Sequence, residues 1–233
     1  MATTPDDTSE AFLREVDENL RRDRAQAMAR RFGPLIVGAV LLLLAAVGGW
    51  MYWQDRQAKA AATDSETLSD AMSDIADKKS AAAVPKLEKL TQSSSDGIAT
   101  EAKLTLAAQA ISDNRRPAAI AIYRAIAADG SAAQPFRDIA TLRLTAMEFD
   151  AIKPEEVIAR LAPLAKPDNP WFGSAGELTG MAMIKAGRKA DAGRLFAAIA
   201  ADKNVPITIR SRAAPMAGTL GVDATGSLPA LSR

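Results

Sequence analysis

The sequence predicts an all-α protein in which a single N-terminal transmembrane helix is followed by a solenoid of about four helical hairpins plus a capping helix. Three observations carry this prediction. No side chain is charged between Arg31 and Asp55. From residue 63 onward the chain is rich in alanine, leucine and charged residues and poor in β-branched runs, a composition that suits helices. The segment YRAIAADG at 123–130 recurs as FAAIAADK at 196–203, and self-similarity at a fixed spacing is typical of helical repeats.

The composition also bears on chemistry, because the 233 residues include no cysteine and no histidine. These absences remove thiolate nucleophiles, cysteine metal sites, the commonest general base and the commonest zinc ligand. We therefore expect a protein that is not an enzyme, with no catalytic residues, no cofactor and no metal.

Residues 1–31 are expected to form a charged cytoplasmic arm, with a short helix over 7–31 whose apolar residues share one face. The flank nearest the membrane, residues 21–31, contains one acidic residue, Asp23, and five basic residues: Arg21, Arg22, Arg24, Arg30 and Arg31. Two interpretations of the arm stay open. It lies on the inner leaflet or touches a partner, or it is a solvated lead-in whose arginines only set topology.

Residues 32–53 are expected to be the transmembrane helix. Their 22 residues make a helix of about 33 Å, enough for a hydrocarbon core of roughly 30 Å. A buried helix of a soluble domain normally shows a polar stripe, and this segment has none. A cleaved signal peptide would use Ala58-Lys59-Ala60, but the apolar run is longer than a signal and bulky aromatics separate it from that point. An uncleaved anchor is the favoured interpretation.

Charge asymmetry predicts the orientation of this anchor. The arginine-rich flank places the N-terminus in the cytoplasm by the positive-inside rule. Trp50, Tyr52 and Trp53 then fall at the outer membrane interface, where aromatic side chains are enriched. Residues 54–62 are expected to be a juxtamembrane linker, and the chain beyond them is expected to be exported to the periplasm.

The exported part, residues 63–220, is expected to be the repeat domain. A capping box at Thr63–Glu66 predicts that a helix begins there. Tyr123 and Phe196 lie 73 residues apart, with a middle copy at Leu161 between them and one more copy upstream at Leu87. Breaker segments at 91–97, 129–135 and 166–171 separate the hairpins, residues 206–220 cap the stack, and 221–233 form a loose tail.

The repeats resemble the tetratricopeptide repeat, which places small residues where the two helices of a hairpin cross and a large one where the next hairpin packs. The positions that carry the resemblance are Ala107, Ala119 and Tyr123 in one copy, Ala192 and Phe196 in another, and Gly187 at a hairpin turn. Val157 and Leu161 depart from the pattern in the middle copy. Thr179 and Gly180 predict a poor first helix in the last copy.

The expected ligand is protein. Beyond the arm the chain has 23 basic and 21 acidic residues, a balance that does not predict nucleic-acid binding. No small-molecule substrate is expected. Trp171 and Phe172 form an adjacent aromatic pair that is either a weak partner-binding candidate or helix packing. Lys153-Pro154-Glu155-Glu156 indicates a helix start rather than a catalytic pair of carboxylates.

The charged arm, the anchor end GGWMYWQDRQ and the alanine-rich repeats together resemble the YfgM-type ancillary subunits of the bacterial Sec translocon. The resemblance implies an inner-membrane protein that associates with the SecYEG channel and with a periplasmic chaperone of the peptidyl-prolyl isomerase type, aiding exported proteins. It implies no catalytic residues. The alternative is a membrane-anchored structural scaffold for another envelope assembly or cell-division complex.

Overall fold

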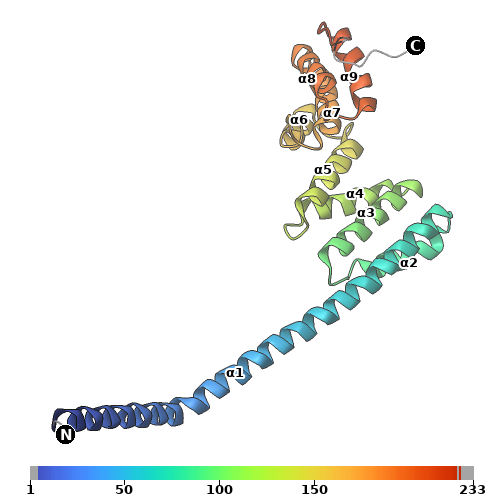
Figure 1. Cartoon of the computed structure of the whole chain (residues 1–233). Coiled ribbons are helices and arrows are strands. Elements are labelled where there is room, and N and C mark those ends of the chain that lie inside the picture. Colours follow the sequence, from blue (N-terminus) through green and yellow to red (C-terminus); the bar gives the residue numbers. More distant parts are fainter. Residues whose placement is uncertain (1–4, 225, 227–233) are drawn as a thin grey trace, which may run out of the picture. The chain divides into compact units, whose positions relative to one another are not determined.

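A computed structural model of the chain describes residues 5–224 and 226, and it divides the chain into two units, residues 1–59 and 60–233. Within the described residues the regular structure consists of nine α-helices and no strand (Figure 1). The predicted all-α fold class is confirmed.

Helix α1 (Pro5–Ala76) runs without interruption through the predicted arm, span and linker. The prediction that a new helix begins at Thr63–Glu66 is therefore wrong. The hydroxyl of Ser65 donates to the carbonyl of Ala61 at 2.8 Å, and that of Thr67 donates to the carbonyl of Thr63 at 2.9 Å. These hydroxyls bond back to the preceding turn, so they do not cap free N–H groups at a new helix start.

The apolar part of α1 contains one candidate membrane span among the residues that the structure describes, within Val37–Ala76. The helix is long and apolar enough to cross a bilayer, and none of its most apolar stretch is buried in the protein. These properties are consistent with single-pass membrane anchoring.

The second unit is a stack of helical hairpins followed by one more helix. Its helices after α1 are α2 (Ser80–Leu90), α3 (Asp96–Ser112), α4 (Arg116–Ala128), α5 (Gln134–Glu148), α6 (Pro154–Leu161), α7 (Phe172–Lys185), α8 (Lys189–Ala201) and α9 (Ile207–Thr219). The end of α1 pairs with α2, α3 with α4, α5 with α6 and α7 with α8, while α9 packs on α8 (Figure 1). The predicted count of four hairpins and a capping helix is confirmed, and the three breaker segments fall where helices end or begin.

Three of the four hairpin turns contain a residue with left-handed backbone: Lys78 (φ 62°), Asn114 (φ 58°) and Gly187 (φ 79°). The amide of the following residue reaches back to the carbonyl five residues earlier, as in Arg115 to Ala110 at 2.7 Å and Arg188 to Met183 at 2.8 Å. This is the Schellman arrangement, which ends one helix and turns the chain sharply toward the next. The hairpin turn predicted at Gly187 is confirmed.

The core is divided into four hydrophobic clusters along the stack. In the second helix of each hairpin the side chain at the repeat position is nearly or fully buried: Leu87 (0% exposed), Tyr123 (4%), Leu161 (0%) and Phe196 (2%). Each cluster lies between neighbouring helices only, which is the packing expected of a solenoid.

Helix α7 is well formed, so the prediction of a poor first helix at Thr179 and Gly180 is wrong. A Cβ atom added at Gly180 would lie 2.7 Å from the Cζ atom of Phe196, and one added at Gly176 would lie 2.8 Å from the Cδ1 atom of Ile199. The glycines therefore allow α8 to approach α7 closely. The tight packing of these two helices offsets the low helix propensity of glycine.

The predicted loose tail begins at residue 221. Val222 packs against the C-terminal cluster and Ala224 is 4% exposed, so the start of the tail contacts the stack. Residues 225 and 227–233 lie outside the described part of the chain.

Candidate functional site

The main concave feature of the repeat unit is a groove along the first helices of the hairpins. One cavity of about 600 Å³ is lined mainly by α1, α3 and α5, and a second of about 780 Å³ mainly by α5, α7 and α9. Ile139 and Arg143 of α5 line both cavities. The two cavities therefore adjoin at α5, and together they are called the groove below. Each falls in the size range of protein ligand pockets.

Helical periodicity explains how the first helices present side chains to this groove. On α5 the groove residues are Ile139, Leu142, Arg143 and Ala146, which are related by spacings of three and four residues. On α7 they are Ser174, Glu177, Leu178 and Met181, with the same three-and-four spacing. Such residues share one helix face, while other faces of the same helices are buried in the core.

The groove gathers most of the large apolar side chains that the repeat unit exposes. In the described part of that unit these are Met72 (46% exposed), Ile111 (44%), Met181 (47%) and Ile207 (51%). Met72 and Ile111 line the first cavity and Met181 lines the second, whereas Ile207 lies outside both. Exposed apolar surface gathered in a groove is typical of a binding surface. Methionine side chains adapt to partners of different shape.

Four ionisable side chains other than tyrosine line the groove: Glu101, Arg143, Glu177 and Arg212. Glu177 and Arg212 form a two-pronged ion pair between α7 and α9, with N···O distances of 3.1 and 2.7 Å. The hydrogen bond to Glu177 raises the pKa of Arg212. Within the described residues, neither Arg143 nor Glu101 forms an ion pair.

Arg143 also affects Tyr123, which lines the first cavity from α4. Burial raises the pKa of the Tyr123 phenol, and the positive charge of Arg143 acts in the opposite direction. The exposed guanidinium of Arg143 is therefore close enough to this cavity to influence a group at its floor.

The residues predicted for repeat packing all lie in the core. Ala107, Ala119, Leu161 and Ala192 are 0% exposed, and Phe196 is 2% exposed. Phe196 and Tyr123 also form part of the groove floor, so the repeat-packing positions support the groove from beneath.

The structure places the adjacent aromatic residues Trp171 and Phe172 in different environments. Phe172 is 2% exposed and packs in the C-terminal core cluster. Because that side chain is surrounded by core residues, it cannot serve as a contact for a partner. Trp171 is partly buried and lines the second cavity, so it remains a candidate for partner contact.

In the N-terminal unit the predicted interface residues Trp50, Tyr52 and Trp53 are 65%, 61% and 55% exposed. The rings of Trp50 and Trp53 lie 5.7 Å apart, and the guanidinium of Arg56 lies 5.3 Å from the ring of Tyr52. Of the topology-setting arginines, Arg30 and Arg31 are exposed. The side chains of Arg21, Arg22 and Arg24 lie outside the described part.

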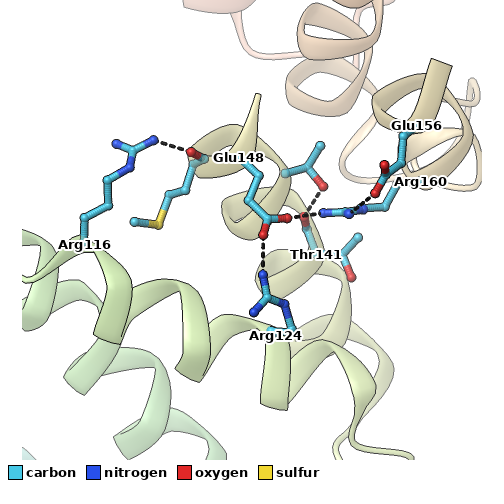
Figure 2. Close-up of polar contacts among 8 residues, drawn as sticks. Arg116, Arg124, Thr141, Glu148, Glu156 and Arg160 are labelled. Atoms are coloured by element: carbon cyan, nitrogen blue, oxygen red, sulfur yellow. Dashed lines mark hydrogen bonds and ion pairs between the residues drawn. The ribbon is translucent and has the colours of Figure 1, made fainter. Parts of the chain in front are cut away.

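A charged network of residues that do not line the groove ties successive hairpins together (Figure 2). Glu148 of α5 accepts hydrogen bonds from Arg124 of α4 and, at 2.7 Å, from Arg160 of α6. Arg160 also donates to Glu156 at 2.7 Å. The hydrogen bond from Arg160 lowers the pKa of Glu148, against the opposing effect of burial. The network holds helices together and has no feature that points to catalysis.

The groove residues at 72, 111, 139, 143 and 181 were not among the sequence-based candidates. The sequence feature that could have identified them is their spacing of three and four residues within the first helices of the hairpins. That signal is weak in this chain because these helices bury apolar residues on other faces as well, so no single apolar stripe stands out. Among the described residues, no group of three or more acidic side chains is arranged to hold a metal ion.

Searches of curated proteins and of solved structures gave no significant match. Residues 27–206 match the family described as "Tetratricopeptide repeat-like domain". Domains of this type are typically protein-interaction modules without catalytic activity, in keeping with the apolar groove. Because the match covers more than half of the 233 residues, the chain belongs to the tetratricopeptide repeat-like family.

Proposed function

We propose that this protein is a non-enzymatic accessory protein of the bacterial inner membrane that binds protein partners along its groove. In this proposal it links the Sec translocon to a periplasmic chaperone and aids the folding or trafficking of exported proteins. The observation that carries the binding role is the pair of adjoining cavities lined mainly by α1, α3, α5, α7 and α9, which gathers the exposed Met72, Ile111 and Met181.

The sequence of α1 supports the proposed location within the cell. Its apolar stretch is long enough to anchor the chain once in a bilayer. The arginines that precede it, including Arg30 and Arg31, favour a cytoplasmic N-terminus. The repeat unit would then face the periplasm, where the groove meets chains that emerge from the translocon.

The resemblance to YfgM-type subunits supports the choice of partners. It rests on the charged arm, on the anchor end at Gly49, Trp50 and Trp53, and on the alanine-rich repeats. The membership of residues 27–206 in a repeat family is compatible with this choice and equally with a scaffold for another envelope complex.

Site-specific photo-cross-linking in intact membranes tests the proposal. A photoreactive amino acid replaces Met181 in the groove, and a matched variant replaces Ile207, which has similar exposure (51% against 47%) but lies outside the groove. We expect adducts with the translocon channel and a periplasmic chaperone from position 181 and far fewer from position 207.

Two results would contradict the proposal. If the adducts at position 181 contain an envelope-assembly or cell-division complex in place of the translocon and chaperone, the scaffold alternative is correct. If positions 181 and 207 give the same adducts, the groove is not the partner-binding surface.

A further inference from the structure

The junction of the two cavities carries a charge as well as apolar surface. Arg143 lines both cavities and its side chain is exposed. Within the described residues it forms no ion pair, whereas Arg124, Arg160 and Arg212 on neighbouring helices are each paired with a glutamate. The centre of the groove therefore presents a cation whose hydrogen-bonding fork is free for a partner.

The other charges of the groove do not neutralise this cation. Glu177 and Arg212 are paired with each other in the second cavity. Glu101 of α3 lines only the first cavity, and its carboxylate is not within ion-pair distance of Arg143. Because Ile139 lies one helical turn from Arg143 on the same face, apolar surface adjoins the cation directly.

We propose that the groove binds an apolar peptide segment that carries one carboxylate, and that Arg143 determines this specificity by pairing with the carboxylate between two apolar subsites. This inference rests on the proposed function, and it names the chemistry of the segment that the groove takes. Met72 and Ile111 contact the apolar side chains on one side of the carboxylate, and Met181 contacts those on the other.

The charge pattern favours this occupant. A purely apolar segment would cover the guanidinium and leave it desolvated without a partner, which is costly. A basic segment would be repelled at the junction. A carboxylate supplies the planar acceptor that matches the guanidinium fork. The methionines allow the flanking apolar residues to vary, so the segment is defined by its pattern and not by one exact sequence.

Fluorescence anisotropy with the full-length protein in detergent micelles tests the inference. The probes are three short fluorescein-labelled peptides that carry leucines on both sides of a central Asp, Asn or Lys. We expect the wild-type protein to bind the Asp peptide roughly 3- to 10-fold more tightly than the Asn peptide, as for an exposed to partly buried ion pair. The Lys peptide should bind most weakly.

Substitutions test whether the preference for the Asp peptide depends on Arg143. Arg143→Gln should bind the Asp and Asn peptides equally, and Arg143→Glu should prefer the Lys peptide. Lys203→Glu is the matched control, because Lys203 is exposed, lies outside both cavities and undergoes the same change of charge. The control should keep the wild-type preference. Glu101→Gln should also keep it.

Equal affinity of the wild-type protein for the Asp and Asn peptides would overturn the inference, as would a preference that survives in Arg143→Gln. Binding of all three peptides with equal affinity, lost in Met181→Asp, would overturn the role of Arg143 while supporting the groove as a binding surface. If no peptide binds, the inference is overturned, and the proposed function is judged separately by the cross-links from position 181.

Discussion

The carboxylate of Glu148 lies 2.7 Å from the guanidinium of Arg160, and this ion pair joins the two helices of the third hairpin. The other carboxylate oxygen of Glu148 accepts from Arg124 of the second hairpin. One side chain thereby connects α4, α5 and α6. The glutamate side chain is 12% exposed and that of Arg160 is 25% exposed, so water screens the pair only in part. α5 carries Arg143, so the network also fixes the helix at the centre of the groove.

Replacing Glu148 should destabilise the repeat unit. In Glu148→Gln the two arginines lose their charged acceptor, and Arg160 is left largely buried without it. We expect the free energy of unfolding to fall by about 1–3 kcal/mol. Urea unfolding of the full-length protein in detergent, followed by circular dichroism, measures the change.

Glu156→Gln is the control for this prediction. Glu156 also pairs with Arg160, but its side chain is 53% exposed. Exposed pairs of this spacing contribute little, and we expect a change below about 0.5 kcal/mol. If both variants lose the same free energy of unfolding, the position of Glu148 between three helices adds nothing to stability.

Stability should fall at acid pH partly through Glu148. Its pKa is lowered in the folded protein, chiefly by the hydrogen bond from Arg160. A carboxyl with a lowered folded pKa contributes stability above its unfolded pKa, about 4.3 for glutamate, and loses it as the pH falls through the folded pKa. The difference in unfolding free energy between wild type and Glu148→Gln should therefore have its largest value at about pH 7 and should decrease below about pH 4. A difference that is independent of pH would contradict this assignment.

Much of the fold could be predicted from the sequence because large and small residues recur at fixed positions of the repeat. Tyr123 and Phe196 lie 73 residues apart, and both are nearly buried in the second helix of a hairpin. Gly187 allows the left-handed turn that ends α7. Both signals can be read from single residues, because a large apolar side chain marks the buried position of the second helix and a glycine favours a left-handed turn.

Other features depend on contacts in the folded protein that cannot be identified from the local sequence. Thr63–Glu66 has the pattern of a helix start, but α1 continues through it, and the hydroxyls of Ser65 and Thr67 bond to carbonyls of the preceding turn. Gly180 has low helix propensity, yet α7 persists because Phe196 packs against it. Arg143 could not be singled out, since only the folded stack shows that nearby arginines have glutamate partners and that Arg143 has none among the described residues.

Adding a methyl group at Gly180 should disrupt the last hairpin. In Gly180→Ala the new Cβ atom would lie 2.7 Å from the Cζ atom of Phe196, a ring that is held in the core at 2% exposure. Overpacking of this kind costs about 1–3 kcal/mol, which exceeds the gain in helix propensity of roughly 1 kcal/mol. Subtracting this gain leaves an expected net loss of up to about 2 kcal/mol in the free energy of unfolding, measured by urea unfolding.

The matched control for that substitution is Gly218→Ala in α9, where no atom lies within 4 Å of the added Cβ atom. It should leave stability unchanged or raise it by up to about 1 kcal/mol. If Gly180→Ala stabilises the protein as much as Gly218→Ala does, then α7 and α8 do not need a glycine at their contact.

The absence of cysteine from the chain allows a direct test of membrane orientation. A single cysteine is introduced either in the arm, as Ser9→Cys, or at the exposed Glu66 beyond the apolar stretch, as Glu66→Cys. Because the arginine-rich flank favours the cytoplasm, a membrane-impermeant maleimide added to spheroplasts should label only Glu66→Cys. Both variants should be labelled after detergent is added, which shows that each thiol is reactive. Labelling of Ser9→Cys alone in intact spheroplasts would reverse the orientation and remove the groove from the periplasm, and with it the proposed contact with a periplasmic chaperone.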